Sequence, residues 1–261
     1  MIPLALELAA RTRAALAWWM LGILAMATYV VVAYDTMVDL DALSRLYESY
    51  PPALRQLFGE VDLSKMDGWI QVELVSYLPL LLAIYGGIFA AGAVSRETEQ
   101  RTIDFILGLP VSRTDFIASR IIVGLWNLFL ICLAVFLFLV IGIALVGRTP
   151  SAGNYALALL NAFLLSGALL TAYVAIATIV DEQSRLTGIT LGLTFVLYIL
   201  TAAFQVADVP DVVRWLTPFE HYHSAQAMTG GGLPVLPMIA LAAAMALAAA
   251  ASVYWYNRRD L

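Results

Sequence analysis

Charged residues are scarce in this chain. Of its 261 residues only 13% are charged and 62% are hydrophobic, whereas a soluble globular domain carries about 25% charged residues. The polar residues are too few to cover a soluble domain of this size, so we expect the chain to lie mostly in the lipid bilayer. The net charge of -5 adds little, because the placement of charge matters more than its sum in a membrane protein. We expect no nucleic-acid partner.

Metal-ligating and reactive side chains are equally rare. The single cysteine, Cys132, allows no internal disulfide and lies in an apolar run, as a small buried hydrophobe does. The only histidines, His221 and His223, lie beside Glu220 in one polar segment. A metal site there lacks further histidine ligands, so we favour a loop at the lipid headgroups and expect no metal. The apolar runs contain almost no ionisable residues, which argues against an ion-coupled carrier or an intramembrane hydrolase.

Six apolar runs are long enough to cross a bilayer core of ~30 Å. They predict an all-α membrane protein with a single domain over 1–261, because no polar segment between them is long enough for a core of its own. A signal peptide is disfavoured, because the first run is too long and contains Trp18 and Trp19, which resemble interfacial anchors. The predicted spans are 14–34, 74–94, 121–147, 155–180, 186–207 and 233–257.

Six spans place both termini on one side of the membrane. Arginines are denser on that side, notably in 95–120 and near both termini, so the positive-inside rule predicts cytosolic termini. The outer segments are then 35–73 and 208–232, each with one short amphipathic helix, at 50–59 and 209–216. Residues 1–13 form either a short interfacial helix or an extension of the first span.

Residues 95–120 form a charged segment between the second and third spans, with four basic and four acidic residues. Gly108 and Pro110 are expected to end a first helix, and Ser112 to cap a second one with Asp115 in its first turn. A helix, a break and a helix would tilt two spans together when pushed. A plain solvated loop is the alternative, and the spacing alone does not decide between the two.

The pattern R-E-x-E-x-x-T-x-x-F-x-L-x-x-P-V-S-R at 96–113 resembles the coupling segment of type-2 ABC exporter permeases. The resemblance implies a membrane subunit in a bacterial or archaeal plasma membrane, paired with a second permease subunit as a homodimer or heterodimer. A separate soluble ABC ATPase would bind ATP and Mg, and this chain, which lacks GxxxxGK[ST], would bind no cofactor and catalyse no reaction. The residues implied in ATPase coupling are Glu97, Glu99, Arg101, Thr102, Phe105, Leu109, Pro110, Val111 and Arg113.

Two further predictions concern the packing of the helices and the substrate. Gly188 and Gly192 have the GxxxG spacing that lets helices approach closely, either between subunits or inside one bundle. Aromatic and weakly polar residues inside the spans predict a cavity for an amphipathic or hydrophobic substrate. The alternative to an export permease is a membrane anchor, a non-transporting subunit or an integral membrane enzyme. The predicted cavity residues are Tyr85, Trp126, Asn127, Asn161, Tyr173, Tyr198 and Gln205.

Overall fold

A computed structural model describes residues 2–36, 42, 45, 48–50, 62–63, 65–95, 112–207 and 209–258. Within these ranges the chain is helical and has no strand, which confirms the all-α fold class. The predicted helix at 50–59 lies almost entirely outside the described residues. In chain order the elements are α1 (Ile2–Thr36), α4 (Met66–Ile70), the π-helical turn η1 (Gln71–Val75), α5 (Leu78–Ala90), the π-helical turn η2 (Ala91–Ser95), α8 (Arg113–Leu145), α9 (Ala152–Ala177), α10 (Gln183–Val206), α11 (Asp211–Arg214), the 3-10 turn η3 (Pro218–His221), α12 (Ser224–Met228) and α13 (Val235–Asn257).

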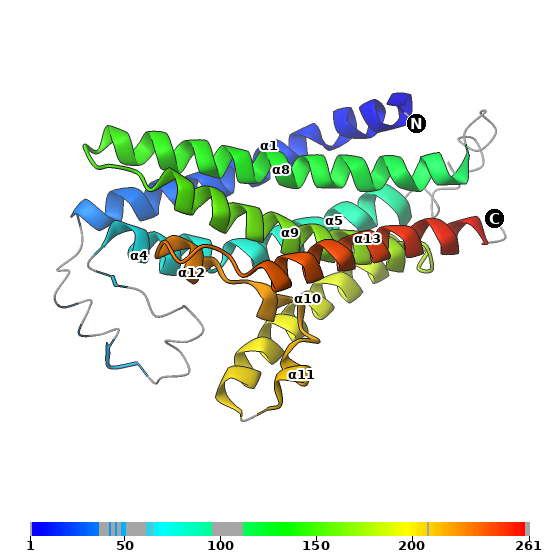
Figure 1. Ribbon diagram of the computed structural model, residues 1–261. Helices are drawn as coiled ribbons and strands as arrows, with labels where there is room; N and C mark the ends of the chain where they lie inside the picture. Colours follow the sequence, from blue (N-terminus) through cyan, green and yellow to red (C-terminus); the bar gives the residue numbers. More distant parts are fainter. Residues whose placement is uncertain are drawn as a thin grey trace.

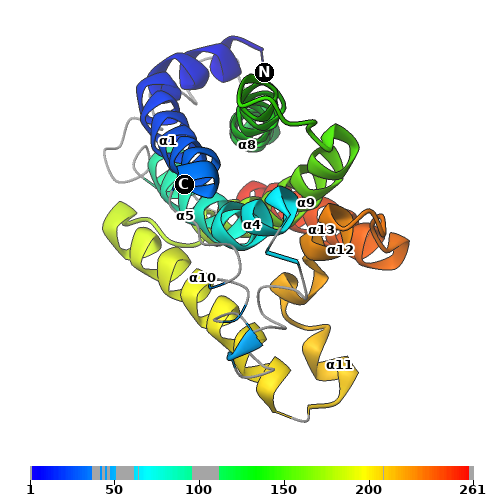
Figure 2. The ribbon, with the colours of Figure 1, turned by 90° about the vertical axis from the view of Figure 1, so that its left-hand side faces the viewer.

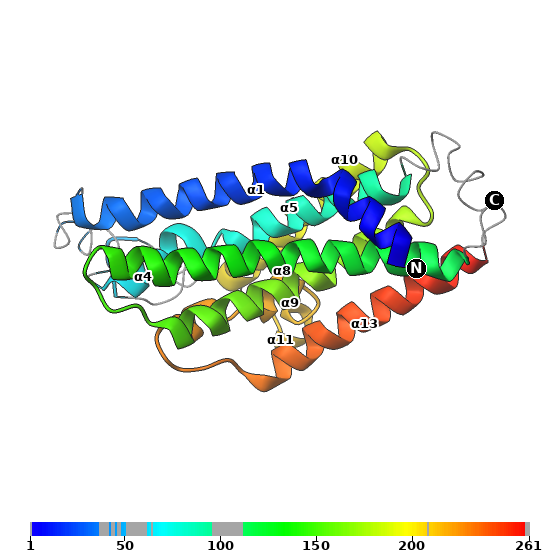
Figure 3. The ribbon, with the colours of Figure 1, turned by 90° about the horizontal axis from the view of Figure 1, so that it is seen from above.

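Six helical segments are long and apolar enough to span a membrane, and each overlaps one predicted run. Residues 2–13 continue the first span as one helix and do not form a separate one. The first turns of α1 bend across α8 (Figure 3). Thr12 lies there, and its hydroxyl donates to the Leu8 carbonyl (3.0 Å), a bond that bends helices. The segments are Ile2–Tyr34, Met66–Val94, Arg113–Leu145, Ala152–Ala177, Gln183–Phe204 and Val235–Asn257.

Helix α9 is the centre of the bundle and packs against α5, α8, α12 and α13. Glycines on its neighbours allow this close approach. A Cβ added at Gly124 of α8 would lie 2.8 Å from Leu170 of α9, and one at Gly86 of α5 would lie 3.3 Å from it. Gly87 similarly faces Thr190 of α10, at 2.6 Å. A larger residue at these positions would therefore crowd the neighbouring helices.

The second span is irregular because of a proline. Pro79 lies in the first turn of α5 and has no backbone N–H, so the Val75 carbonyl lacks its usual helical donor. The Tyr222 hydroxyl donates to this carbonyl instead, at 2.7 Å. The span widens here into η1 and again into η2 at its other end, so α5 lies between two π-helical turns.

Both termini lie at the same end of the bundle (Figure 1). We call it the N/C end; that it faces the cytosol stays a prediction. Viewed along the bundle, α10 and α11 extend away from the other helices (Figure 2). Residues 209–234, called here the return segment, lead back from α10 to α13 through α11, η3 and α12, and η3 and α12 pack on the spans.

Candidate functional site

The predicted coupling segment, 95–120, is described only at its two ends. Ser95 ends η2, and α8 begins at Arg113. Of the residues implied in coupling, Arg113 alone is described, so the helix–break–helix arrangement stays a prediction. Outside the described residues lie Glu97, Glu99, Arg101, Thr102, Phe105, Leu109, Pro110 and Val111.

The predicted start of the second helix of this segment, capped by Ser112, is confirmed. The Ser112 hydroxyl accepts the backbone N–H of Asp115 (3.0 Å) and donates to the Asp115 carboxylate (2.9 Å). The carboxylate also lies near the positive end of the helix dipole, where a negative charge stabilises a helix. The helix of the third span therefore begins at a fixed residue within the coupling segment.

Arg120 was predicted to belong to the charged loop, but its side chain is buried, with 2% exposed. Its Nε donates to the Ala93 carbonyl in η2 (3.2 Å), and its Nη1 donates to the Ser119 hydroxyl (2.8 Å). The guanidinium lies 3.7 Å from the centre of the Phe116 ring, within cation–π distance. Arg120 thus connects the third span to the end of the second.

The sixth span, α13, contacts the same part of α8. The ring of Tyr256 on α13 stacks on Phe116 with centroids 5.4 Å apart, and Asn257 donates to the Thr114 hydroxyl at 3.1 Å. Ala93, Phe116, Ser119, Arg120 and Tyr256, called here the Arg120 junction, therefore bring together three spans at the N/C end.

At the opposite end, side chains of the spans hold the return segment. The Asn161 amide on α9 donates to the His221 carbonyl (3.2 Å) and accepts the His223 backbone N–H (2.7 Å). Gln71 of η1 donates to the Ser224 hydroxyl at 2.9 Å. The 3-10 turn η3 and helix α12 therefore pack against the spans, while the expected position of this segment at the lipid headgroups stays a prediction.

The ring of His221 has partners in the protein, and His223 is bonded through its backbone N–H. The His223 Nδ1 atom is buried without a hydrogen-bond partner among the described residues. The His221 ring nitrogen Nε2 lies 3.1 Å from the Trp215 carbonyl, and the His221 ring packs edge-on against Trp215. Among the described residues, no three His, Cys, Asp or Glu side chains are grouped closely enough to hold a metal ion. The geometry at His221 and His223 is that of a hydrogen-bonded turn.

The family model of ABC-2 family transporter proteins matches residues 6–261. The chain belongs to this family. It is therefore the multi-pass membrane part of an ABC transporter, a permease, and the family implies an associated ATP-binding subunit. No curated protein matches the sequence.

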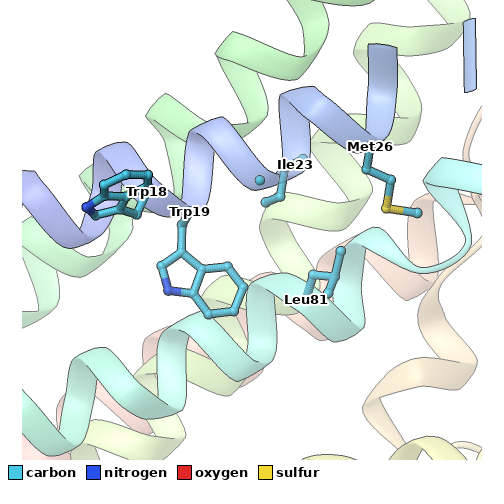
Figure 4. Close-up of a pocket in the computed structure, with 6 residues that line it drawn as sticks. Trp18, Trp19, Ile23, Met26 and Leu81 are labelled. Atoms are coloured by element: carbon cyan, nitrogen blue, oxygen red, sulfur yellow. The ribbon is translucent and has the colours of Figure 1, made fainter. Parts of the chain in front are cut away.

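The permease has an apolar groove between α1 and α5, with a cavity of about 410 Å³ (Figure 4). Trp18 and Trp19 line one part of the groove, and 72% of the Trp18 surface is exposed. A Cβ added at Gly22 would meet no atom within 4 Å. The Trp19 ring meets Tyr85 edge-on, with centroids 5.7 Å apart. The remaining lining residues are Ile23, Met26 and Leu81.

Most of the predicted cavity residues instead bond helices of the permease to one another. The Tyr85 hydroxyl accepts from the Asn127 amide at 2.9 Å, and the Tyr173 and Thr194 hydroxyls are 2.5 Å apart. Asn161 holds the return segment. The ring of Tyr198 packs on Phe219, and Trp126 is exposed beside Phe129; the side chain of Gln205 is not described. The groove at Trp18 and Gly22 is an apolar cavity that the sequence did not indicate.

The GxxxG pair of α10 has no neighbour within the described part of the chain. A Cβ added at Gly188 or Gly192 would meet no atom within 4 Å. Of the two alternatives, packing inside one bundle has no support within the described part of the chain, whereas Gly86, Gly87 and Gly124 do make such contacts. A contact with another subunit stays open for Gly188 and Gly192.

Proposed function

We propose that this permease is the membrane subunit of an ATP-driven exporter in a bacterial or archaeal plasma membrane. A separate soluble ABC ATPase would dock on 95–120 at the cytosolic N/C end and hydrolyse ATP with Mg. The observation that carries this proposal is the Arg120 junction, which lies where the docking segment joins the second and third spans. Because the junction contacts the second, third and sixth spans, a force on the segment would be passed on to the bundle.

The proposed cargo is an amphipathic or hydrophobic molecule. The apolar groove between α1 and α5 supports this, because a cavity of about 410 Å³ beside Trp18 and Gly22 offers no charged group to an ionic substrate. The export direction rests on the resemblance of 96–113 to exporter coupling segments.

The proposed working unit contains two permease subunits and two ATPases. The open face of α10 at Gly188 and Gly192 is proposed to contact the second permease subunit, since small residues permit close helix approach within a membrane. Whether the second subunit is identical to the first is left to experiment.

The test starts with a search of the neighbouring reading frames for an ATPase that carries GxxxxGK[ST]. Co-expression of the two proteins should yield a complex with ATPase activity, which in inside-out vesicles takes up fluorescent amphipathic dyes or lipid analogues when ATP is present. Glu97→Ala and Arg113→Ala should reduce dye uptake while the complex still assembles. Failure of any such ATPase to bind, or uptake of inorganic ions but of no lipophilic probe, would contradict the function or the cargo, respectively.

A further inference from the structure

The Arg120 junction contains a buried guanidinium. Removing such a charge from water costs free energy unless other groups replace the water. A buried guanidinium is stable only when hydrogen bonds and nearby π-systems replace its lost hydration. Here the Ala93 carbonyl, the Ser119 hydroxyl and the Phe116 ring do so. The Tyr256 ring, stacked on Phe116, extends this arrangement to the sixth span.

The shape of the arginine side chain fixes the directions of these hydrogen bonds. The guanidinium is a planar fork with donors in fixed directions, whereas a lysine ammonium is a point charge on a flexible stem. The bond from Arg120 to Ala93 therefore fixes the position of η2 relative to α8. Since Ser95 ends η2 and Arg113 begins α8, the bond closes the two ends of the docking segment onto each other.

Helix α5 of the second span links the Arg120 junction to the opposite end of the bundle. Helix α5 runs without interruption from η2 toward η1, where the Val75 carbonyl accepts the Tyr222 hydroxyl of the return segment at 2.7 Å. Each π-helical turn thus has one carbonyl bonded to a side chain of another element, Ala93 to Arg120 and Val75 to Tyr222. Such turns are frequent at functional sites.

We propose that Arg120 is a positioning residue for coupling. It ties the second span to the third, so that a displacement of 95–120 by the ATPase moves α5 and, through Val75 and Tyr222, the return segment. This inference rests on the proposed ATP-driven function.

The experiment uses the full permease–ATPase complex in nanodiscs. A reporter cysteine replaces Thr229, an exposed residue of the return segment, in a Cys132→Ala background. Its labelling rate with a membrane-impermeant maleimide is compared without nucleotide and with ATP plus vanadate. We expect the two rates to differ by about fivefold or more, the ratio typical of coupled sites, and Arg120→Met to abolish this difference.

Two variants separate positioning from folding. Arg185→Met removes an exposed arginine in the first turn of α10 and should leave the rate difference intact. Arg120→Lys keeps the charge, so the complex should assemble and bind the ATPase, yet it should lose most of the rate difference. A purely structural role would lower the yield or thermal stability of the complex without changing the nucleotide response of the assembled fraction.

The outcomes are distinct. An unchanged rate difference in Arg120→Lys or in assembled Arg120→Met overturns the role of Arg120, and so does a parent complex that hydrolyses ATP without any change at the reporter. If the permease binds no ATPase at all, the proposed function itself fails, and the inference fails with it.

Discussion

The hydrogen bond between Tyr222 and Val75 provides a direct test of how the return segment is held. Tyr222→Phe keeps the ring but removes the hydroxyl, which leaves the Val75 carbonyl without this donor. Pro79→Ala restores a backbone N–H at the position from which a regular helix would donate to Val75. The two substitutions should therefore compensate each other.

The expected magnitude follows from the cost of an unsatisfied carbonyl. A buried acceptor without a donor costs about 1–3 kcal/mol, while hydrogen bonds between membrane helices average about 0.6 kcal/mol with a maximum near 1.7. We expect Tyr222→Phe to lower the free energy of unfolding by about 1 kcal/mol in the wild-type background and by about 0.3 kcal/mol with Pro79→Ala. Burial raises the pKa of the Tyr222 phenol, so the bond should persist to at least about pH 9, since a free phenol titrates near pH 10.

The assay is a double-mutant cycle by unfolding of the purified permease in mixed micelles of mild detergent and SDS. The matched control is Tyr254→Phe, because Tyr254 lies on the exposed side of α13 at 51% exposure and should change stability little. Equal costs of Tyr222→Phe in both backgrounds would refute the idea that Pro79 creates the acceptor for Tyr222.

Other contacts give further expectations, each measured by thermal unfolding unless stated. Asn161→Leu removes two hydrogen bonds to the return segment and should cost about 2 kcal/mol. Gly124→Ala crowds the fourth span and should cost about 1–3 kcal/mol, whereas Gly188→Leu should leave the single subunit unchanged but reduce dimer in native mass spectra. Asp67→Leu removes the acceptor for two hydroxyls at the start of the fourth span and should cost about 1.5–3 kcal/mol. Ser112→Ala should cost about 1 kcal/mol through the lost helix cap.

The spans and the helix cap could be predicted because their signals are local. A long uncharged run has only one way to satisfy its backbone in lipid, as a helix, and each predicted run overlaps a spanning helix. The cap needs only Ser112 and a partner three residues later. The first three spanning helices begin 8 to 12 residues before the predicted spans, because polar residues at a span boundary can continue the helix.

The packing could not be predicted, because it depends on which residues meet from distant segments. Arg120 looked like a loop charge, and only the approach of η2 and α13 buries it. The GxxxG spacing at Gly188 does not say which face of a helix meets a neighbour. Two signals were present for the return segment: Asn161 inside a span needs a hydrogen-bonding partner, and Pro79 frees a carbonyl. Neither one identifies that partner.

The most direct test of the account is the amount of dye transported per ATP hydrolysed by the permease–ATPase complex in proteoliposomes, with and without two glycines inserted after Pro110. The account predicts that the insertion leaves ATPase binding and hydrolysis in place while transport per ATP falls about tenfold or more, a loss in the range of coupling between sites. Unchanged transport per ATP in the insertion variant would contradict the claim that 95–120 couples the ATPase to the spans.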